Sequence, residues 1–150
     1  MARIEEAIQQ RQFENIYQKV IINILFTNNW VVDIQQKVFR PFGLTYQQYN
    51  VLRILRGKHP TPYTAKGIKE VMLDKRPDLT RMLDRLQKKN LVFREIDSCN
   101  RSKLAITLTD QGCEILNRIE PELKRIYDEL GALSAEEAET LSDLLDKLRS

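Results

Sequence analysis

The segment from Leu79 to Leu86 most constrains what this chain can fold into, because it is apolar on one side and basic on the other. Its apolar residues recur at i, i+3, i+4 and i+7, the spacing of one core-facing stripe on an α-helix: Leu79, Met82, Leu83 and Leu86. Three cations lie on the opposite side of the same helix: Arg81, Arg85 and Lys88. By itself this pattern is typical of a solvated surface helix. The residues that follow it indicate a more specific structure.

Two segments with strand character come after the helix. Residues 91–96 are rich in β-branched and aromatic side chains. Residues 103–108 alternate, with Leu104, Ile106 and Leu108 on one face. The residues between the two segments are mostly turn formers. We therefore expect a long β-hairpin with an exposed, cationic tip.

The charges of the chain are strongly separated along the sequence. Residues 75–103 hold nine Lys or Arg and four Asp or Glu residues, a net charge of +5, whereas residues 110–150 carry a net charge of −6. The net charge of the whole chain is only +3, which conceals this separation. A basic centre beside an acidic end favours a polyanionic partner that meets one face of the protein.

A second short helix is expected just before the basic one. Thr64 is a plausible N-cap for residues 65–72, and a short turn separates the two helices. Asp74 or Arg76 would then cap the basic helix, with Pro77 in its first turn. Two short helices about a tight turn, the second of them basic, form a helix-turn-helix. Together with the hairpin this predicts a winged helix-turn-helix, in a mainly α fold with a small β-hairpin wing.

The first forty residues predict one long helix. They contain no Gly or Pro, and their apolar residues keep helical spacing from Ile16 to Phe39. Such a helix is too long and too apolar to pack only on a small DNA-binding unit. A second copy of the chain is the simplest partner for the remaining apolar surface.

Helices are also expected after the hairpin. One of them has Thr109 as its N-cap and contains Pro121, where we expect a kink or a restart. The last helix opens with a capping box at Ser134. It carries a clean apolar stripe: Leu141, Leu144, Leu145 and Leu148.

Several classes of function are disfavoured by the composition. The chain has one histidine, His59, and none of its five glycines forms a phosphate-binding pattern, so we expect no enzyme, no cofactor and no metal site. Cys99 and Cys113 are not spaced as a redox or metal motif. The sequence opens with a charged segment, and its most apolar run, residues 20–26, is too short to span a bilayer. We therefore expect a cytoplasmic protein without membrane contact.

Four motifs occur in a characteristic order along the chain: Phe42-Gly43-Leu44-Thr45 with Gln48 and Val51-Leu52; Leu79-Thr80-Arg81-Met82-Leu83-Asp84-Arg85-Leu86; Lys89-Asn90-Leu91-Val92; and Leu108-Thr109-Asp110-Gln111-Gly112. With them the chain resembles the MarR family of bacterial winged helix-turn-helix transcriptional regulators over nearly all of its length. The resemblance implies a homodimer whose N- and C-terminal helices interdigitate, with each subunit reading one half of a pseudo-palindromic operator. It also implies a cleft for small aromatic or lipophilic ligands between the dimer region and the DNA-binding lobe.

The tip of the wing departs from the family pattern. Asp97 and Arg101 match the family, but Cys99 stands where an arginine is usual and Asn100 where an aspartate is usual. The salt links that normally brace the wing are therefore expected to be incomplete, and the tip looser. Arg101 remains suited to a narrow minor groove.

The N-terminal half of a recognition helix projects into the major groove. We therefore expect DNA contacts from this part of the helix, from the turn before it and from the wing tip: Lys75, Arg76, Asp78, Thr80, Arg81, Arg85, Asn100, Arg101 and Lys103. Arg76 and Arg81 are suited to bidentate contacts with guanine, whereas Arg85 lies farther along the helix, toward phosphate. A ligand site, with aromatic core packing as the alternative, is expected where the long first helix meets the second: Trp30, Phe39, Phe42, Tyr46 and Tyr49.

The sequence thus predicts a homodimeric, sequence-specific DNA-binding transcriptional regulator, most simply a repressor, with a small aromatic or lipophilic ligand as the expected type of effector. Its parts are an N-terminal dimerisation helix region (1–42), a winged helix-turn-helix DNA-binding lobe (43–112) and C-terminal dimerisation helices (113–150). Two alternatives stay open. One is a redox-responsive regulator that uses Cys99, and the other is a winged-helix protein-interaction module that does not bind DNA.

Overall fold

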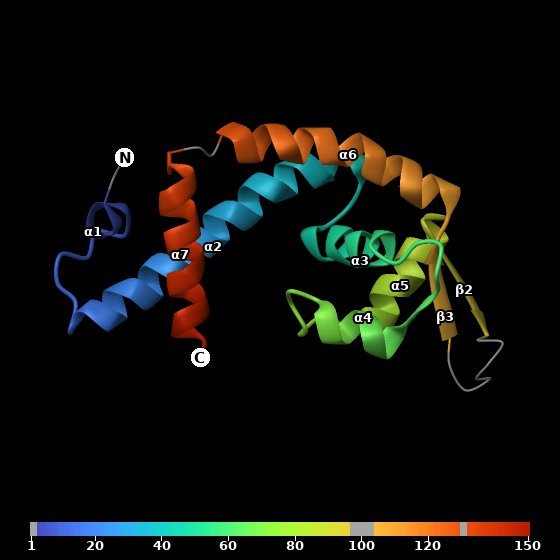
Figure 1. The fold of residues 1–150 in the computed structure, drawn as a ribbon, viewed down its shortest axis with the longest axis horizontal. Helices are drawn as coiled ribbons and strands as arrows, with labels where there is room; N and C mark the ends of the chain where they lie inside the picture. The colour runs from blue at the N-terminus through green and yellow to red at the C-terminus, as the bar shows by residue number, and fades with distance from the viewer. Residues whose placement is uncertain (1–2, 97–103, 130–131) are drawn as a thin grey trace.

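The computed structural model describes residues 3–96, 104–129 and 132–150, and it is mainly helical with one small sheet (Figure 1). The elements follow one another in this order: α1 (Ile4–Ala7), α2 (Ile16–Phe39), the 3-10 helix η1 (Arg40–Phe42), α3 (Tyr46–Arg56), β1 (Tyr63–Thr64), α4 (Ala65–Val71), α5 (Leu79–Lys88), β2 (Val92–Ile96), β3 (Leu104–Leu108), α6 (Asp110–Glu129) and α7 (Ala135–Leu148). The expected fold class, a winged helix-turn-helix with additional helices at both ends, is confirmed.

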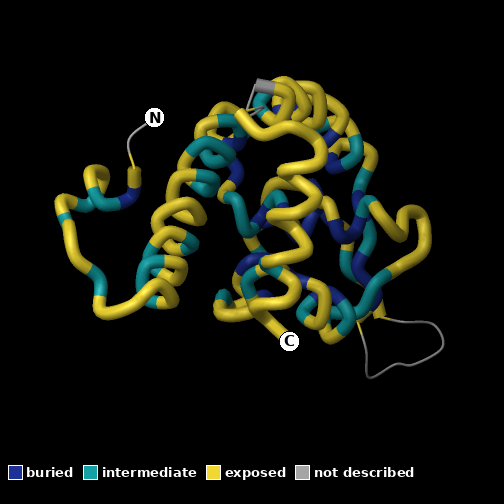
Figure 2. The backbone as a smooth tube through the Cα atoms, turned by 60° about the vertical axis from the view of Figure 1, so that its left-hand side comes forward, coloured by how far each residue is buried: buried dark blue, intermediate teal, exposed yellow. Residues whose placement is uncertain are grey.

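The core lies in the lobe formed by α3, α4, α5, the strands and the first part of α6. In Figure 2 the buried residues gather in this lobe, while α7 and the N-terminal part of α2 are mostly exposed. Buried side chains come from each helix of the lobe and from β2 and β3: Val51, Leu52 and Leu55 of α3, Ile68 of α4, the stripe of α5, Val92 of β2, Ile106 and Leu108 of β3, and Leu116, Ile119 and Leu123 of α6. The four residues of the α5 stripe are all buried, as their spacing predicted.

The sheet has three antiparallel strands in the order β1-β3-β2. The hairpin of β2 and β3 pairs Val92 with Leu108 and Arg94 with Ile106, which confirms the two predicted strands. The short strand β1 pairs Tyr63 with Ile106 on the other side of β3. Sequence reasoning missed β1, because two residues are too few to show an alternating pattern. The predicted tip, with Asp97, Cys99, Asn100 and Arg101, lies outside the described residues.

The expected long first helix is wrong in its first part. The chain forms the four-residue helix α1, and then Gln9 adopts a left-handed backbone conformation (φ 54°), which cannot continue a right-handed helix. The long helix α2 begins only at Ile16. Its N-cap is Asn15, whose side chain accepts a hydrogen bond from the backbone N–H of Gln18 at 2.9 Å.

Two expectations about proline also need correction. The N-cap of α5 is Asp78, so neither Asp74 nor Arg76 caps the helix, and Pro77 precedes it. The helix α6 runs through Pro121 from Asp110 to Glu129, so the expected restart does not occur, whereas the alternative expectation, a kink, stays a prediction. A proline removes one backbone donor from a helix, and α6 tolerates the loss at an exposed position.

The end of the wing is fastened to the start of α6 through Thr109, the predicted N-cap. Its hydroxyl accepts the N–H of Gly112 at 3.0 Å and donates to the carbonyl oxygen of Asn90 at 2.6 Å. Its own N–H donates to the carbonyl oxygen of Leu91 at 3.2 Å. Next to these bonds, the buried Gly112 packs closely against the backbone of Leu91.

Candidate nucleic-acid interface

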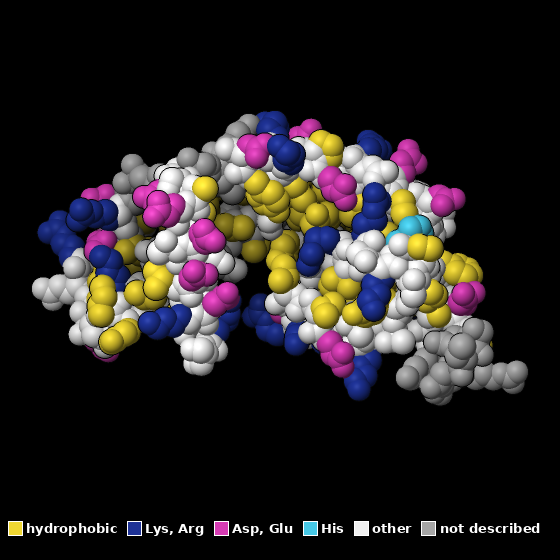
Figure 3. All heavy atoms as spheres, viewed as in Figure 1, with side chains coloured by type: hydrophobic (Ala, Val, Ile, Leu, Met, Phe, Trp, Pro, Cys, Tyr) yellow, Lys and Arg dark blue, Asp and Glu magenta, His cyan; other side chains and the backbone are white. Residues whose placement is uncertain are grey.

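The helix α5 presents a polar face to solvent on the side opposite its buried stripe. Thr80, Arg81, Arg85 and Lys88 are all exposed, which is the arrangement that the sequence predicted. Acidic side chains line α7, whereas many Lys and Arg side chains lie over the lobe (Figure 3). The lobe therefore offers a helix of suitable charge and accessibility to a polyanion.

The loop before α5 is fixed by two contacts from neighbouring helices. The buried side chain of Asn50 in α3 accepts the N–H of Leu73 at 3.2 Å through Oδ1. The Nζ of Lys69 in α4 donates to the carbonyl oxygen of Pro77 at 2.7 Å. Sequence reasoning missed both residues; a polar side chain at a buried position of α3 is the signal that could have found Asn50.

Arg76 lies in this loop and is held by Asp74. Its Nε donates to Oδ1 of Asp74 at 3.0 Å, its Nη2 donates to Oδ2 at 3.2 Å, and its backbone N–H donates to Oδ1 at 3.1 Å. These hydrogen bonds, first that of the Arg76 side chain, hold the pKa of the Asp74 carboxyl below its usual range. The pair therefore stays ionic at neutral pH, with the guanidinium on the outside.

The structure gives Asp78 a role within the protein. Its Oδ1 accepts the N–H of Arg81 at 3.2 Å, which caps the helix, and its Oδ2 lies 3.4 Å from Nε of Arg81. Lys75, Thr80 and Arg85 are exposed, and their expected contacts with DNA stay predictions. The remaining predicted contacts, Asn100, Arg101 and Lys103, lie outside the described residues, and their roles stay predictions.

Arg94 connects the wing to α5. It lies on the face of β2 that also carries Val92, and its side chain is only 18% exposed. Its Nη2 donates to Oδ1 of Asp84 at 2.6 Å, and its Nε donates to Oε1 of Gln87 at 2.6 Å. Sequence reasoning counted Arg94 only toward the basic charge, although the period of two along the strand would have placed it on the inner face. This brace couples the position of the wing to that of α5.

Of the five aromatic residues predicted to line a ligand site, three lie near one another. The ring of Phe39 stacks on that of Tyr49 with centroids 4.4 Å apart, and it lies 6.5 Å from the ring of Tyr46. Phe42 lies under the guanidinium of Arg118, 5.3 Å from the ring centre. Trp30 is about half exposed and lies nearer the N-terminus of α2 than Phe39 does. Because Phe39 is fully buried, its ring belongs to the core.

Burial raises the pKa of the Tyr46 and Tyr49 hydroxyls. Both side chains therefore remain neutral hydrogen-bonding groups at physiological pH. Across residues 3–96, 104–129 and 132–150, no group of His, Cys, Asp and Glu side chains is arranged to hold a metal ion. Within the same ranges, none of the helices combines the length and apolar character needed to cross a bilayer.

Comparison with known proteins supports the interpretation from the geometry. A model described as the MarR family matches residues 44–102. The homoprotocatechuate degradative operon repressor of Escherichia coli is 31% identical over 114 residues, which are 73% of this chain and 76% of the relative. The HTH-type transcriptional regulator MgrA of Staphylococcus aureus is 32% identical over 115 residues, which are 75% of this chain and 74% of the relative.

Solved structures share the fold. A MarR transcription factor from Planctomyces limnophilus has a TM-score of 0.69 and 32% identity, covering 90% of this chain and 98% of that chain. A mutant of the Escherichia coli protein MarR, complexed with operator DNA, has a TM-score of 0.79 and 27% identity, covering 91% of this chain and 98% of that chain. These relatives are transcriptional regulators, which agrees with the expectation that the chain is not an enzyme. The winged helix-turn-helix, its exposed basic helix and these similarities together show that the chain belongs to the MarR family of DNA-binding transcriptional regulators.

Proposed function

We propose that this protein is a homodimeric repressor whose two α5 helices read the halves of a pseudo-palindromic operator in successive major grooves. The observation that carries the proposal is the exposed face of α5, which presents Thr80, Arg81 and Arg85 to solvent. The loop before α5 adds Arg76, which is exposed and paired with Asp74. A recognition helix reads base edges with its N-terminal half, and Arg81 lies in that half. The relative solved with operator DNA supports this mode of binding.

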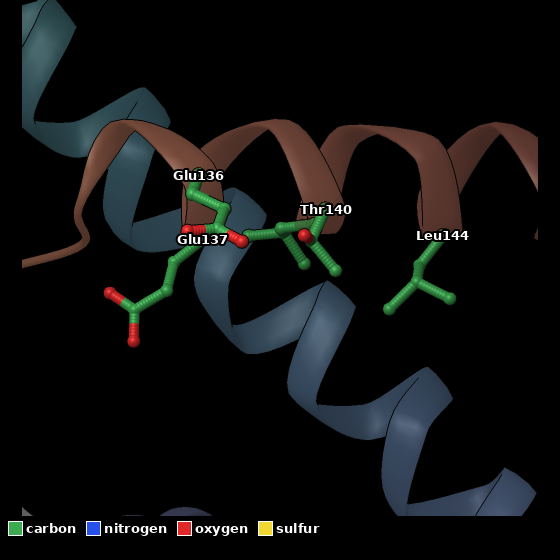
Figure 4. A pocket seen from close by; sticks show the side chains of 5 residues that line it. Glu136, Glu137, Thr140 and Leu144 are labelled. Atoms are coloured by element: carbon green, nitrogen blue, oxygen red, sulfur yellow. The ribbon is translucent and has the colours of Figure 1, made fainter.

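The exposed apolar side chains of α2 and α7 support the homodimer. No residue of α7 is buried, although Leu141, Leu144 and Leu148 form a stripe along it. An open hollow of about 300 Å³ is lined by α7 residues, among them Leu141 and Leu144, and Figure 4 shows Leu144 beside it. Further exposed apolar side chains lie on α2: Ile16, Tyr17, Val20, Ile21, Leu25, Phe26 and Trp30. Such an apolar surface is characteristic of an interface, and a second copy of the chain can cover it symmetrically.

Replacing Arg81 with alanine is expected to weaken operator binding by roughly 10-fold, because a bidentate contact to guanine is worth about 1–3 kcal/mol. The operator is first selected from random duplexes with the purified protein; half-sites about one helical turn apart support the proposed geometry. Fluorescence anisotropy at fixed salt then measures the affinity.

Lys124→Ala is the control for this experiment, since Lys124 is an exposed cation on α6 that pairs with Asp128 at 2.8 Å. Circular dichroism and sedimentation show whether the Arg81 variant keeps its fold and oligomeric state. Equal affinities of the Arg81 variant and the wild type would remove Arg81 from the interface. Failure of the wild type to bind any duplex at low salt would favour the protein-interaction module instead.

A small aromatic acid is our proposal for the effector. The observation that favours it is the position of the Arg118 guanidinium over the ring of Phe42, because a cation next to an aromatic ring suits an aromatic carboxylate. Aromatic acids are expected to raise the melting temperature in a thermal shift assay, and Arg118→Ala is expected to abolish the rise. A panel of aromatic acids that gives no stabilisation would leave the aromatic residues as core packing alone.

A further inference from the structure

The loop between α4 and α5, residues 72–78, contains an ion pair that the proposed function does not by itself explain. We propose that Asp74 is a specificity-determining residue: by clamping Arg76 it makes this arginine discriminate between bases instead of attracting any DNA backbone. The inference rests on the proposed DNA reading by α5, and it concerns a residue that would not itself contact a base.

In this ion pair, which we call the clamp, the carboxylate is largely buried and the guanidinium is exposed to solvent. The side chain of Asp74 is 22% exposed, whereas that of Arg76 is 92% exposed. Asp74 also accepts the backbone N–H of Arg76, so one carboxylate fixes both the turn of the chain and the direction of the guanidinium. The contacts of Asn50 and Lys69 hold the two ends of the loop in place.

The pairing with Asp74 leaves N–H donors on both terminal nitrogens of the Arg76 guanidinium available for a base. A guanidinium has five N–H donors in one plane. Asp74 uses Nε and one donor of Nη2, which leaves three donors, including one on each terminal nitrogen. Two parallel N–H groups of this kind match O6 and N7 of guanine in the major groove. Arg76 can therefore keep the clamp and make a bidentate contact to a base at the same time.

Asp78 holds Arg81 less tightly than Asp74 holds Arg76, and we therefore assign the role to Asp74 and not to Asp78. The Asp78 carboxylate is 55% exposed and makes one contact of 3.4 Å to the Arg81 side chain. Asp78 also caps α5, so its removal would disturb the helix itself. Asp74 lies outside the helix, and its effect on Arg76 can be separated from helix stability.

The charge of Asp74 acts against non-specific binding. A free arginine beside DNA neutralises a phosphate and releases a counterion, whatever the sequence of the duplex. A carboxylate paired with Arg76 cancels much of this attraction. What remains favourable is the directed contact to a base edge, and this contact depends on sequence.

The test is the Asp74→Asn variant of the full chain, because asparagine keeps the Oδ1 acceptor for the backbone N–H of Arg76 but removes the charge. Anisotropy titrations compare a selected operator with a shuffled duplex of equal length at several salt concentrations. The ratio of the two affinities is expected to fall about 10-fold, the value of one bidentate contact. For the shuffled duplex, the slope of log affinity against log salt is expected to steepen by about 1.

Asp128→Asn is the matched control, since it removes the same charge from another ion pair, with Lys124 on α6. It is expected to leave the ratio unchanged. In the Arg76→Ala background, Asp74→Asn should lower the ratio no further, because the effect passes through Arg76. Should Asp74→Asn fail to fold, Arg76→Lys keeps the positive charge, lacks the planar fork, and is expected to lose the same discrimination.

An unchanged ratio in Asp74→Asn, beside a wild type that discriminates, would overturn the role of Asp74 and leave the proposed function intact. A further fall in the Arg76→Ala background would also overturn it, since Asp74 would then act without Arg76. A wild type that binds neither duplex would reject the proposed function itself, and the inference with it.

Discussion

Alanine at position 112 is expected to destabilise the protein by about 3 kcal/mol, the upper part of the usual range for overpacking a well-packed site. A Cβ on Gly112 would clash with the Leu91 carbonyl oxygen, well inside the van der Waals contact distance of the two atoms, and would lie only 3.2 Å from the Leu91 carbonyl carbon and from Cδ2 of Leu108. Neither backbone atom can move easily, because Thr109 is bonded to both Asn90 and Leu91. The wing and α6 must therefore separate for the methyl group to fit.

Chemical denaturation of the two proteins measures this effect, and Gly57→Ala is its control. A Cβ at Gly57 would meet nothing closer than the carbonyl oxygen of Ile54 at 3.5 Å, which is an ordinary contact. Gly57 has helical backbone angles, so this variant is expected to be neutral or slightly more stable. Equal stabilities of the Gly112 variant and the wild type would show that the joint between the wing and α6 is not tightly packed.

The double variant Leu141→Asp, Leu144→Asp is expected to be monomeric and to bind the operator on the order of 10²–10⁴-fold more weakly. Both side chains are exposed on α7, and a carboxylate at an apolar interface would lose its hydration without gaining a partner. A monomer reads one half-site only, so it loses the gain in affinity that comes from linking two binding events. Analytical ultracentrifugation gives the oligomeric state, and anisotropy with a selected operator gives the affinity.

Ser142→Asp provides the matching control, because it places a similar charge on the same helix outside the apolar stripe. It is expected to remain dimeric and to bind normally. A double variant that still sediments as a dimer would move the interface away from α7. Loss of binding by a protein that remains dimeric would indicate that the substitutions act on the lobe instead.

Local patterns predicted the elements that depend on neighbouring residues. The stripe from Leu79 to Leu86 lies at one period of a helix, so it specified the buried face of α5 before any tertiary contact was known. The capping residues Thr64 and Ser134 were found in the same way, since each cap binds a backbone N–H three residues along the chain. The break in the first helix escaped prediction, because nothing in the composition marks the left-handed backbone of Gln9.

Tertiary structure decided which charges neutralise one another. Arg94 and Asp84 are ten residues apart, on a strand and a helix, and their pairing depends on how the wing folds back onto α5. The clamp between Asp74 and Arg76 is close in sequence, but its loop takes its shape between Asn50, which binds Leu73, and Lys69, which binds Pro77. The sequence by itself determined that a basic amphipathic helix and a wing would lie in one lobe, because periodicity and capping act over a few residues. Only the tertiary structure decided which arginines brace the lobe and which face solvent, because an ion pair forms where packing brings two groups within hydrogen-bonding distance.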